Sequence, residues 1–293
     1  MNVAVVDVGS NTVRLLVGRR KRGGIEEVAA ERIRVALGAD VERFGHVSEA
    51  RLRSAAKAVK KLCSAARSEG AEEVDVVITS PGRQADNADE LVEVLRRAAA
   101  APVRVLSAEE EASLSHRGAV AATGPHEGLV AVCDVGGAST ELVLGLPERT
   151  PSWVRSVDLG ALRLTTRYEL GEKPAADTVE AARAEVARVF AEVVPPLPRA
   201  ALAVGGSARA VHKLVDSPEL GAEELERAVE LLATKSHRTL TRRHGIDARR
   251  LRLLLAGALI LAEVQRRLIL PFEVADAGLR EGALLSQLDA MAA

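Results

Sequence analysis

Residues 7–18 read Asp-Val-Gly-Ser-Asn-Thr-Val-Arg-Leu-Leu-Val-Gly, and residues 134–145 read Asp-Val-Gly-Gly-Ala-Ser-Thr-Glu-Leu-Val-Leu-Gly. The two stretches align without a gap and share Asp, Val, Gly, Leu and Gly at corresponding positions. Each copy connects two apolar runs, which predicts a β-hairpin with a glycine-rich turn. Small turn residues let backbone N–H groups approach an anion, and the Asp carboxylate can hold a cation beside it. Because the sequence contains this motif twice, we expect its two domains to bind one phosphate chain between them.

Both halves of the chain alternate short apolar strands with amphipathic helices. Examples of the helices are 48–68 in the first half and 178–194 in the second. This alternation predicts an α/β fold with largely parallel sheets covered by helices. Gly124-Pro125 stands directly before the second hairpin and marks a boundary. We therefore expect one domain over residues 1–124 and another over 125–293, with the terminal helix able to pack back on the first.

The composition excludes several classes of protein. The 293 residues are 47% hydrophobic and 28% charged, with a formal net charge of -1, as in soluble globular proteins. Near-neutral charge and only 2% aromatic residues argue against a nucleic-acid partner. Cys63 and Cys133 stand far apart, so the sequence predicts neither a disulfide framework nor a zinc site. No apolar stretch suits a membrane span or a signal region, so we expect a cytoplasmic protein without a membrane partner.

A third glycine-rich turn and an arginine follow other predicted strands. Gly205-Gly206-Ser207 opens a helix, and the N-terminus of a helix attracts anions. Arg83 comes just after the strand at 74–79, where strand ends face ligand crevices, and arginine suits bidentate phosphate contact. The alternatives are a tight corner for the glycines and a solvated loop residue for Arg83.

The acidic run Glu109-Glu110-Glu111 follows the strand that ends at Leu106. A carboxylate at this place could act as general base on a water molecule. Acidic residues in the first turn of a helix also simply complement the helix dipole. The basic stretch 235–252 likewise has two interpretations: a solvated helix face, or a path for an extended polyanion.

These motifs together resemble the exopolyphosphatase and guanosine pentaphosphate phosphohydrolase family of the acetate kinase, Hsp70 and actin superfamily. Residues 7–11 look like its first phosphate motif, and 134–141 are similar to its Asp-Ile-Gly-Gly-Gly-Ser-Thr-Glu motif. Residues 79–87 match its Thr-Ser-x-x-Arg-x-Ala-x-Asn signature, and 109–112 its acidic catalytic segment. The turn at 205–207 and Gly-Leu-Arg-Glu-Gly at 278–282 also fit. The resemblance covers the whole chain and is to the short, two-domain members.

The resemblance implies two ribonuclease-H-like domains with the active site in the cleft between them. It implies that Glu111 is the general base, with Glu141 as the competing candidate. Asp7, Asp134 and Glu141 would hold Mg²⁺ or Mn²⁺, mostly through water. The implied phosphate-binding residues come from the three turns and the arginine motif: Ser10, Asn11, Arg83, Gly136, Gly137, Ser139, Gly206 and Ser207.

The sequence departs from the family pattern at two places. Ala138 replaces the third glycine of the second phosphate motif, which narrows the approach of the backbone to phosphate. Pro81-Gly82 replaces the usual small-plus-aliphatic pair before Arg83, which changes the flexibility of that segment.

Three functions compete at this level. The first is an exopolyphosphatase, a phosphoric anhydride hydrolase that removes terminal phosphates from inorganic polyphosphate through a base-activated water. The second is hydrolysis of guanosine pentaphosphate on the same scaffold. The third is a nonhydrolytic, actin-like nucleotide-binding regulator, against which the retention of Arg83, Glu111, Asp134 and Glu141 speaks. A homodimer is left open.

Overall fold

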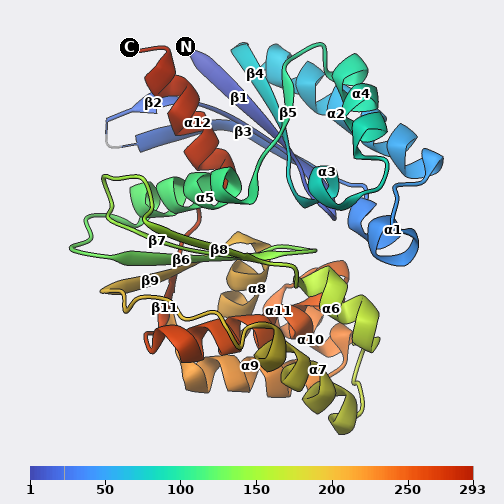
Figure 1. Cartoon of the computed structure of the whole chain (residues 1–293), viewed down its shortest axis with the longest axis vertical. Coiled ribbons are helices and arrows are strands. Elements are labelled where there is room, and N and C mark those ends of the chain that lie inside the picture. Colours follow the sequence, from blue (N-terminus) through green and yellow to red (C-terminus); the bar gives the residue numbers. More distant parts are fainter. Residues whose placement is uncertain (23, 293) are drawn as a thin grey trace. The chain divides into compact units, whose positions relative to one another are not determined.

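The computed structural model describes residues 1–22 and 24–292, and the chain forms two compact units (Figure 1). Unit 1 combines Met1–Ala121 with the C-terminal segment from Leu279, and unit 2 is Ala122–Gly278. The chain therefore passes from unit 1 to unit 2 and back. In the described part of the chain, no helix is both long and apolar enough to cross a membrane.

Unit 1 is built on a five-stranded sheet of order β3-β2-β1-β4-β5. Its strands are β1 (Asn2–Val8), β2 (Thr12–Lys21), β3 (Gly24–Arg34), β4 (Ala71–Ile78) and β5 (Val103–Val105). Its helices are α1 (Leu37–Phe44), α2 (Glu49–Ser68), α3 (Ser80–Gln84), α4 (Ala88–Ala99), α5 (Ala108–Thr123) and α12 (Leu279–Ala290).

Both faces of this sheet are covered, which explains why β1 is apolar without interruption over residues 3–6. Ala4, Val6 and Val8 belong to a core that includes residues of α2 and α4. Val3 and Val5 point to the opposite face, because side chains alternate along a strand, and belong to a second core completed by α12. The last helix of the chain, α12, thus packs on the sheet that contains the first strand, β1 (Figure 1).

Unit 2 has a six-stranded sheet of order β10-β11-β9-β6-β7-β8. Its strands are β6 (Val130–Val135), β7 (Thr140–Gly145), β8 (Trp153–Val157), β9 (Ala200–Val204), β10 (Glu219–Leu220) and β11 (Phe272–Val274). Its helices are α6 (Ala161–Tyr168), α7 (Ala176–Val189), α8 (Gly205–Val215), α9 (Ala222–Thr234), α10 (His237–His244) and α11 (Ala248–Leu268). One large apolar core contains buried side chains from the strands and from all six helices.

The predicted α/β class and both predicted hairpins are confirmed. β1 pairs antiparallel with β2, and β6 with β7, with the glycine-rich turns between them. The sheets are mixed, however, and not largely parallel as expected. β1–β4–β5 and β6–β9–β11 are parallel, whereas each hairpin adds a third antiparallel strand, β3 or β8. The connections β2–β3 and β7–β8 are short, which suits an antiparallel meander and not a parallel crossover.

Candidate active site

The first glycine-rich turn closes with a backbone hydrogen bond from Gly9 N to Thr12 O of 3.0 Å. Asp7, 8% exposed, lies directly opposite Arg14 across the β1–β2 ladder, so the two side chains share one face of the sheet. The start of α1 holds the turn from behind: Gly38 N donates to Ser10 O at 2.8 Å, and Ala36 N to Asn11 O at 3.0 Å.

Arg83 lies on α3, a short helix directly after β4 and Thr79. Pro81 stands in its first turn, where a missing N–H costs nothing. A methyl group on Gly82 would come within 2.9 Å of Ile78 Cγ2, so this glycine lets the helix pack closely against the sheet. The departure Pro81-Gly82 therefore builds a compact helix, and Arg83 is not the solvated loop residue of the alternative interpretation.

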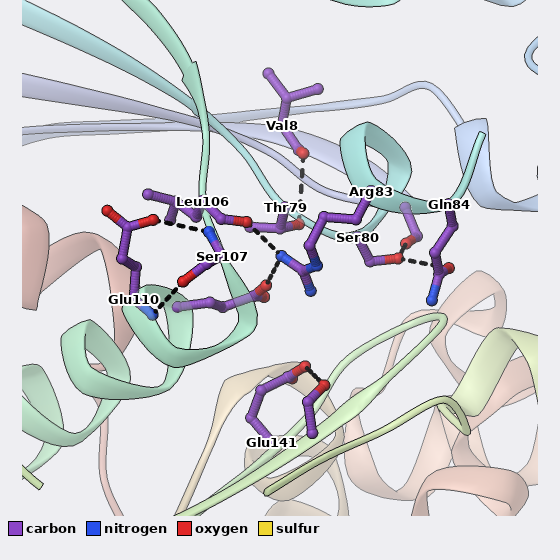
Figure 2. A network of polar contacts seen from close by, with 12 residues as sticks. Val8, Thr79, Ser80, Arg83, Gln84, Leu106, Ser107, Glu110 and Glu141 are labelled. Carbon is purple, nitrogen blue, oxygen red and sulfur yellow. Dashed lines mark hydrogen bonds and ion pairs between the residues drawn. The ribbon is translucent and has the colours of Figure 1, made fainter. Parts of the chain in front are cut away.

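The Arg83 guanidinium connects two elements of unit 1 (Figure 2). Its Nη1 donates to Leu106 O at 2.8 Å and forms an ion pair with Glu111 Oε2 at 2.8 Å. The two side chains are only 21% and 12% exposed, so the pair is largely shielded from solvent. The structure thus brings together two of the residues predicted from the sequence.

Two neighbouring residues of the acidic run on α5 make different contacts. Glu110 Oε2 accepts a hydrogen bond from Ser107 N at 2.8 Å, and Ser107 Oγ accepts one from Glu110 N at 3.1 Å (Figure 2). This reciprocal pattern is a capping box, so Glu110 serves the helix itself. Glu111 instead pairs with Arg83. The helix-terminus interpretation therefore applies to Glu110. The general-base interpretation, which concerns Glu111, stays a prediction.

The second turn repeats the first at the level of single hydrogen bonds. Gly136 N donates to Ser139 O at 3.0 Å, as Gly9 does to Thr12. Asp134 lies directly opposite Glu141, which is 2% exposed and accepts a hydrogen bond from Ser156 Oγ at 2.9 Å. Ser139 is 3% exposed, and Ala138 is also buried, at 6%.

The third turn lies beside Asp134, because β6 and β9 are parallel neighbours and Asp134 pairs with Val204. Gly205 has φ 84°, a left-handed conformation that favours glycine, and a methyl group there would lie 2.6 Å from Asp134 Oδ1. The next residues, Gly206 and Ser207, form the first turn of α8, whose N-terminus attracts anions. Two of the three glycine-rich turns thus lie together at the carboxyl ends of the neighbouring strands β6 and β9 of unit 2.

Asp134 and Glu141 both act on the neighbouring Cys133 thiol. The pKa of the Cys133 thiol is raised well above its ordinary value, first by complete burial and then by the charges of these two carboxylates. Like charges directly opposite each other on paired strands are destabilising, and a bound cation relieves them. Two carboxylates suit Mg²⁺, which prefers oxygen ligands and keeps several waters. Among residues 1–22 and 24–292, no group of three His, Cys, Asp or Glu side chains is arranged to hold a metal.

Two arginines at these turns were given no role from the sequence. Arg14 occupies the position in the first hairpin that Glu141 occupies in the second, so the aligned repeats already contained its signal. The Arg250 guanidinium lies directly against the Cα of Gly206, at the start of α8. The sequence showed Arg250 only as one of several arginines in the stretch 235–252, because the α8–α11 contact that selects it is tertiary.

Comparison with known proteins matches residues 16–291 to the Ppx/GppA phosphatase family. The chain is 28% identical over 309 residues to exopolyphosphatase 1 of Mycobacterium bovis, covering 100% of this chain and 90% of that protein. A crystal structure of the Aquifex aeolicus member of the Ppx/GppA family has a TM-score of 0.84 and 25% identity, covering 99% of this chain and 98% of that one. An exopolyphosphatase structure from Cytophaga hutchinsonii shares the fold, with a TM-score of 0.85 at 21% identity and coverage of 99% and 98%.

Proposed function

The chain belongs to the Ppx/GppA phosphatase family, and from this premise we propose that it is an exopolyphosphatase that hydrolyses the terminal phosphate of inorganic polyphosphate. The family predicted from the motifs is confirmed, and its relatives make the chain a hydrolase of the phosphatase type. The choice of inorganic polyphosphate as the substrate rests on one feature of unit 2, the basic segment 235–252.

The basic segment covers α10 and the start of α11, and it contacts the third turn near its C-terminal end. Arg250 lies against Gly206, and Arg238, Arg242, Arg243 and Arg249 are exposed. Among the described residues, none of these four exposed arginines takes part in a salt bridge. The single acidic residue of the segment is Asp247, which caps α11: its Oδ1 accepts a hydrogen bond from Arg249 N at 2.8 Å. Four exposed arginines outside any salt bridge of the described residues suit a long polyanion better than one nucleotide.

We assign the chemical step to Glu111, as the general base that takes a proton from the attacking water. Its ion pair with Arg83 holds the carboxylate in one place. Arg83, the backbone of the three turns and Arg250 would bind phosphate oxygens, so that charge developing in the transition state meets fixed donors. Ser10, Asn11, Ser139 and Ser207 belong to those turns.

Asp134 and Glu141 are the carboxylates that we expect to hold Mg²⁺ or Mn²⁺. In unit 1 the position opposite Asp7 is an arginine, whereas in unit 2 the position opposite Asp134 is Glu141. The need for a cation is therefore greater at the second hairpin, and Asp7 is a further predicted ligand. A bound divalent ion would neutralise charge on the phosphate oxygens.

Guanosine pentaphosphate is the second candidate substrate, and one observation favours it. Phe44, the last residue of α1, is 52% exposed, with the Arg43 guanidinium 5.2 Å from its ring centroid and the His46 ring at 6.1 Å. An exposed aromatic ring with an arginine is a surface on which a nucleobase can stack. The helix α1 that carries it is bonded at its other end to the first turn.

The test measures phosphate release from tripolyphosphate, long-chain polyphosphate and guanosine pentaphosphate side by side, with and without magnesium. We expect release from both polyphosphates. Replacing Arg238, Arg242 and Arg243 together by Gln should lower kcat/KM for the long chain much more than for tripolyphosphate, whereas Phe44→Ala should leave both unchanged. Release from guanosine pentaphosphate alone, lost in Phe44→Ala, would replace the first candidate by the second.

A further inference from the structure

Gly160, the residue before α6, lies against the backbone of the second phosphate turn. A methyl group on Gly160 would come within 2.6 Å of the carbonyl carbon and oxygen of Gly137 and 2.7 Å of Ala138 N. Its φ of -127° and ψ of 175° are extended values that any residue adopts. Glycine is therefore needed here only because position 160 lies so close to residues 137 and 138. The atoms in contact are backbone atoms, so no side-chain rotation can relieve the overlap.

The same approach allows the first turn of α6 to bind the carbonyl groups of the phosphate turn. Ala161 N donates to Gly136 O at 2.9 Å, and Leu162 N and Arg163 N donate to Gly137 O at 2.8 and 3.0 Å. In a trans peptide the C=O and the following N–H point in opposite directions. Because α6 holds the carbonyls of Gly136 and Gly137, the N–H groups of Gly137 and Ala138 are aimed away from α6.

This arrangement decides which N–H groups of the turn can serve a ligand. The N–H of Gly136 is used inside the turn, where it donates to Ser139 O at 3.0 Å. The N–H groups of Gly137 and Ala138 are the two that the α6 contacts orient outward. Thr140 supports the arrangement from the other side, since its buried Oγ1 donates to Leu159 O at 2.6 Å.

We propose that Gly160 is a positioning residue, which sets the direction of the Gly137 and Ala138 N–H groups toward a phosphate oxygen. The proposal rests on the proposed function in one respect, that the ligand of the second turn is a phosphate chain. Ala138 in place of glycine does not weaken this role, because its contribution is a backbone N–H.

The experiment compares Gly160→Ala with Gly221→Ala. Gly221 also precedes a helix of unit 2, α9, in an extended conformation, but a methyl group there meets side-chain atoms and no backbone: the far end of Glu224 at 2.9 Å and Pro271 Cβ at 3.9 Å. Binding of tripolyphosphate is measured by calorimetry in the Glu111→Gln background, and KM and kcat in the otherwise wild-type chain. We expect Gly160→Ala to weaken tripolyphosphate binding and to raise KM at least about tenfold, because it misdirects hydrogen bonds to a charged group. The change in kcat should be smaller. Gly221→Ala should match its parent in both.

Thr140→Val is a second variant for the case that Gly160→Ala does not fold. It removes the hydrogen bond to Leu159 O at constant shape, and it should raise KM in the same direction by a smaller factor. Wild-type KM and affinity in folded Gly160→Ala, or in Thr140→Val when Gly160→Ala does not fold, would overturn the proposal. If the unmodified chain binds tripolyphosphate but releases no phosphate from any substrate, the proposed function fails. The binding comparison then still decides the role of Gly160.

Discussion

Replacing Glu111 by Gln tests the assignment of the general base most directly. The change keeps the shape of the side chain and an oxygen that can accept from Arg83, and it removes the basicity. Loss of a general base lowers rates by about 10²–10⁴-fold. This corresponds to roughly 2.7–5.4 kcal/mol of activation free energy, at 1.36 kcal/mol for each factor of ten. We expect kcat for tripolyphosphate to fall by this factor while the dissociation constant stays within about threefold, a difference of under ~1 kcal/mol.

The same substitution also has a cost in stability, which the structure allows us to bound. Arg83 and Glu111 are 21% and 12% exposed at a distance of 2.8 Å, so the pair lies mostly out of solvent. Breaking a fully buried pair costs about 3–5 kcal/mol. Arg83 keeps its hydrogen bond to Leu106 O, and the Gln oxygen remains an acceptor, so we expect a loss of about 1–3 kcal/mol. Denaturant unfolding measures this loss separately from kcat.

Glu110→Gln is the matched control, because it makes the same chemical change one residue earlier. Glu110 accepts from Ser107 N, and Gln serves equally well in a capping box. The control should therefore keep wild-type kcat and stability. If Glu111→Gln turned over at the wild-type rate while Glu141→Gln was inactive, the base would be Glu141 and the role given to Glu111 would be wrong.

Four further changes have expected outcomes. Gly205→Ala should lower the unfolding free energy by about 1–2 kcal/mol, because its backbone is left-handed, and it should weaken metal binding in calorimetric titrations, because the methyl group meets Asp134. The control Gly245→Ala, at φ 62°, should show the loss of stability but no change in metal binding. Asp134→Asn should raise the magnesium concentration needed for half-maximal turnover, and turnover that survives exhaustive chelation would contradict the metal assignment. Gly282→Ala should destabilise unit 1 by about 1–3 kcal/mol in thermal unfolding, because the methyl group would overlap the backbone of α5. Burial lowers the pKa of His237 below 6.5, so the unfolded chain binds more protons in that range; stability should fall as pH is lowered through 6.5, and less so in His237→Asn.

The parts of the site that the sequence predicted are those encoded by local pattern. The two hairpins followed from a repeat whose apolar runs alternate with glycine-rich turns, and the register confirms that Asp7 and Asp134 hold equivalent places. That α8 begins at Gly205 also followed from the local sequence. These predictions succeeded because hydrogen bonds within a hairpin or a helix start connect residues close in sequence.

The parts that the sequence did not predict depend on contacts between distant residues. Gly160 is separated from Ala138 by two strands, β7 and β8, and nothing in its neighbourhood signals that its Cα meets a turn backbone. The helix α3 contains Pro81 and Gly82, both poor helix formers, and it exists because it packs against the sheet. Periodicity contains no information on such tertiary contacts.

The duplicated hairpin separates what the backbone supplies from what the side chains supply. Both copies have the same turn hydrogen bond, and in both the following helix, α1 or α6, donates N–H groups to carbonyls of the turn. The backbone arrangement of the turn is therefore common to the two copies. The residue opposite the aspartate differs: Arg14 lies opposite Asp7, whereas Glu141 places a second carboxylate opposite Asp134. Under the proposed function, the first hairpin would meet phosphate with its own positive charge, and the second would need a divalent cation to do so. The different charge of the residue opposite the aspartate would thus give the two hairpins different roles in binding phosphate.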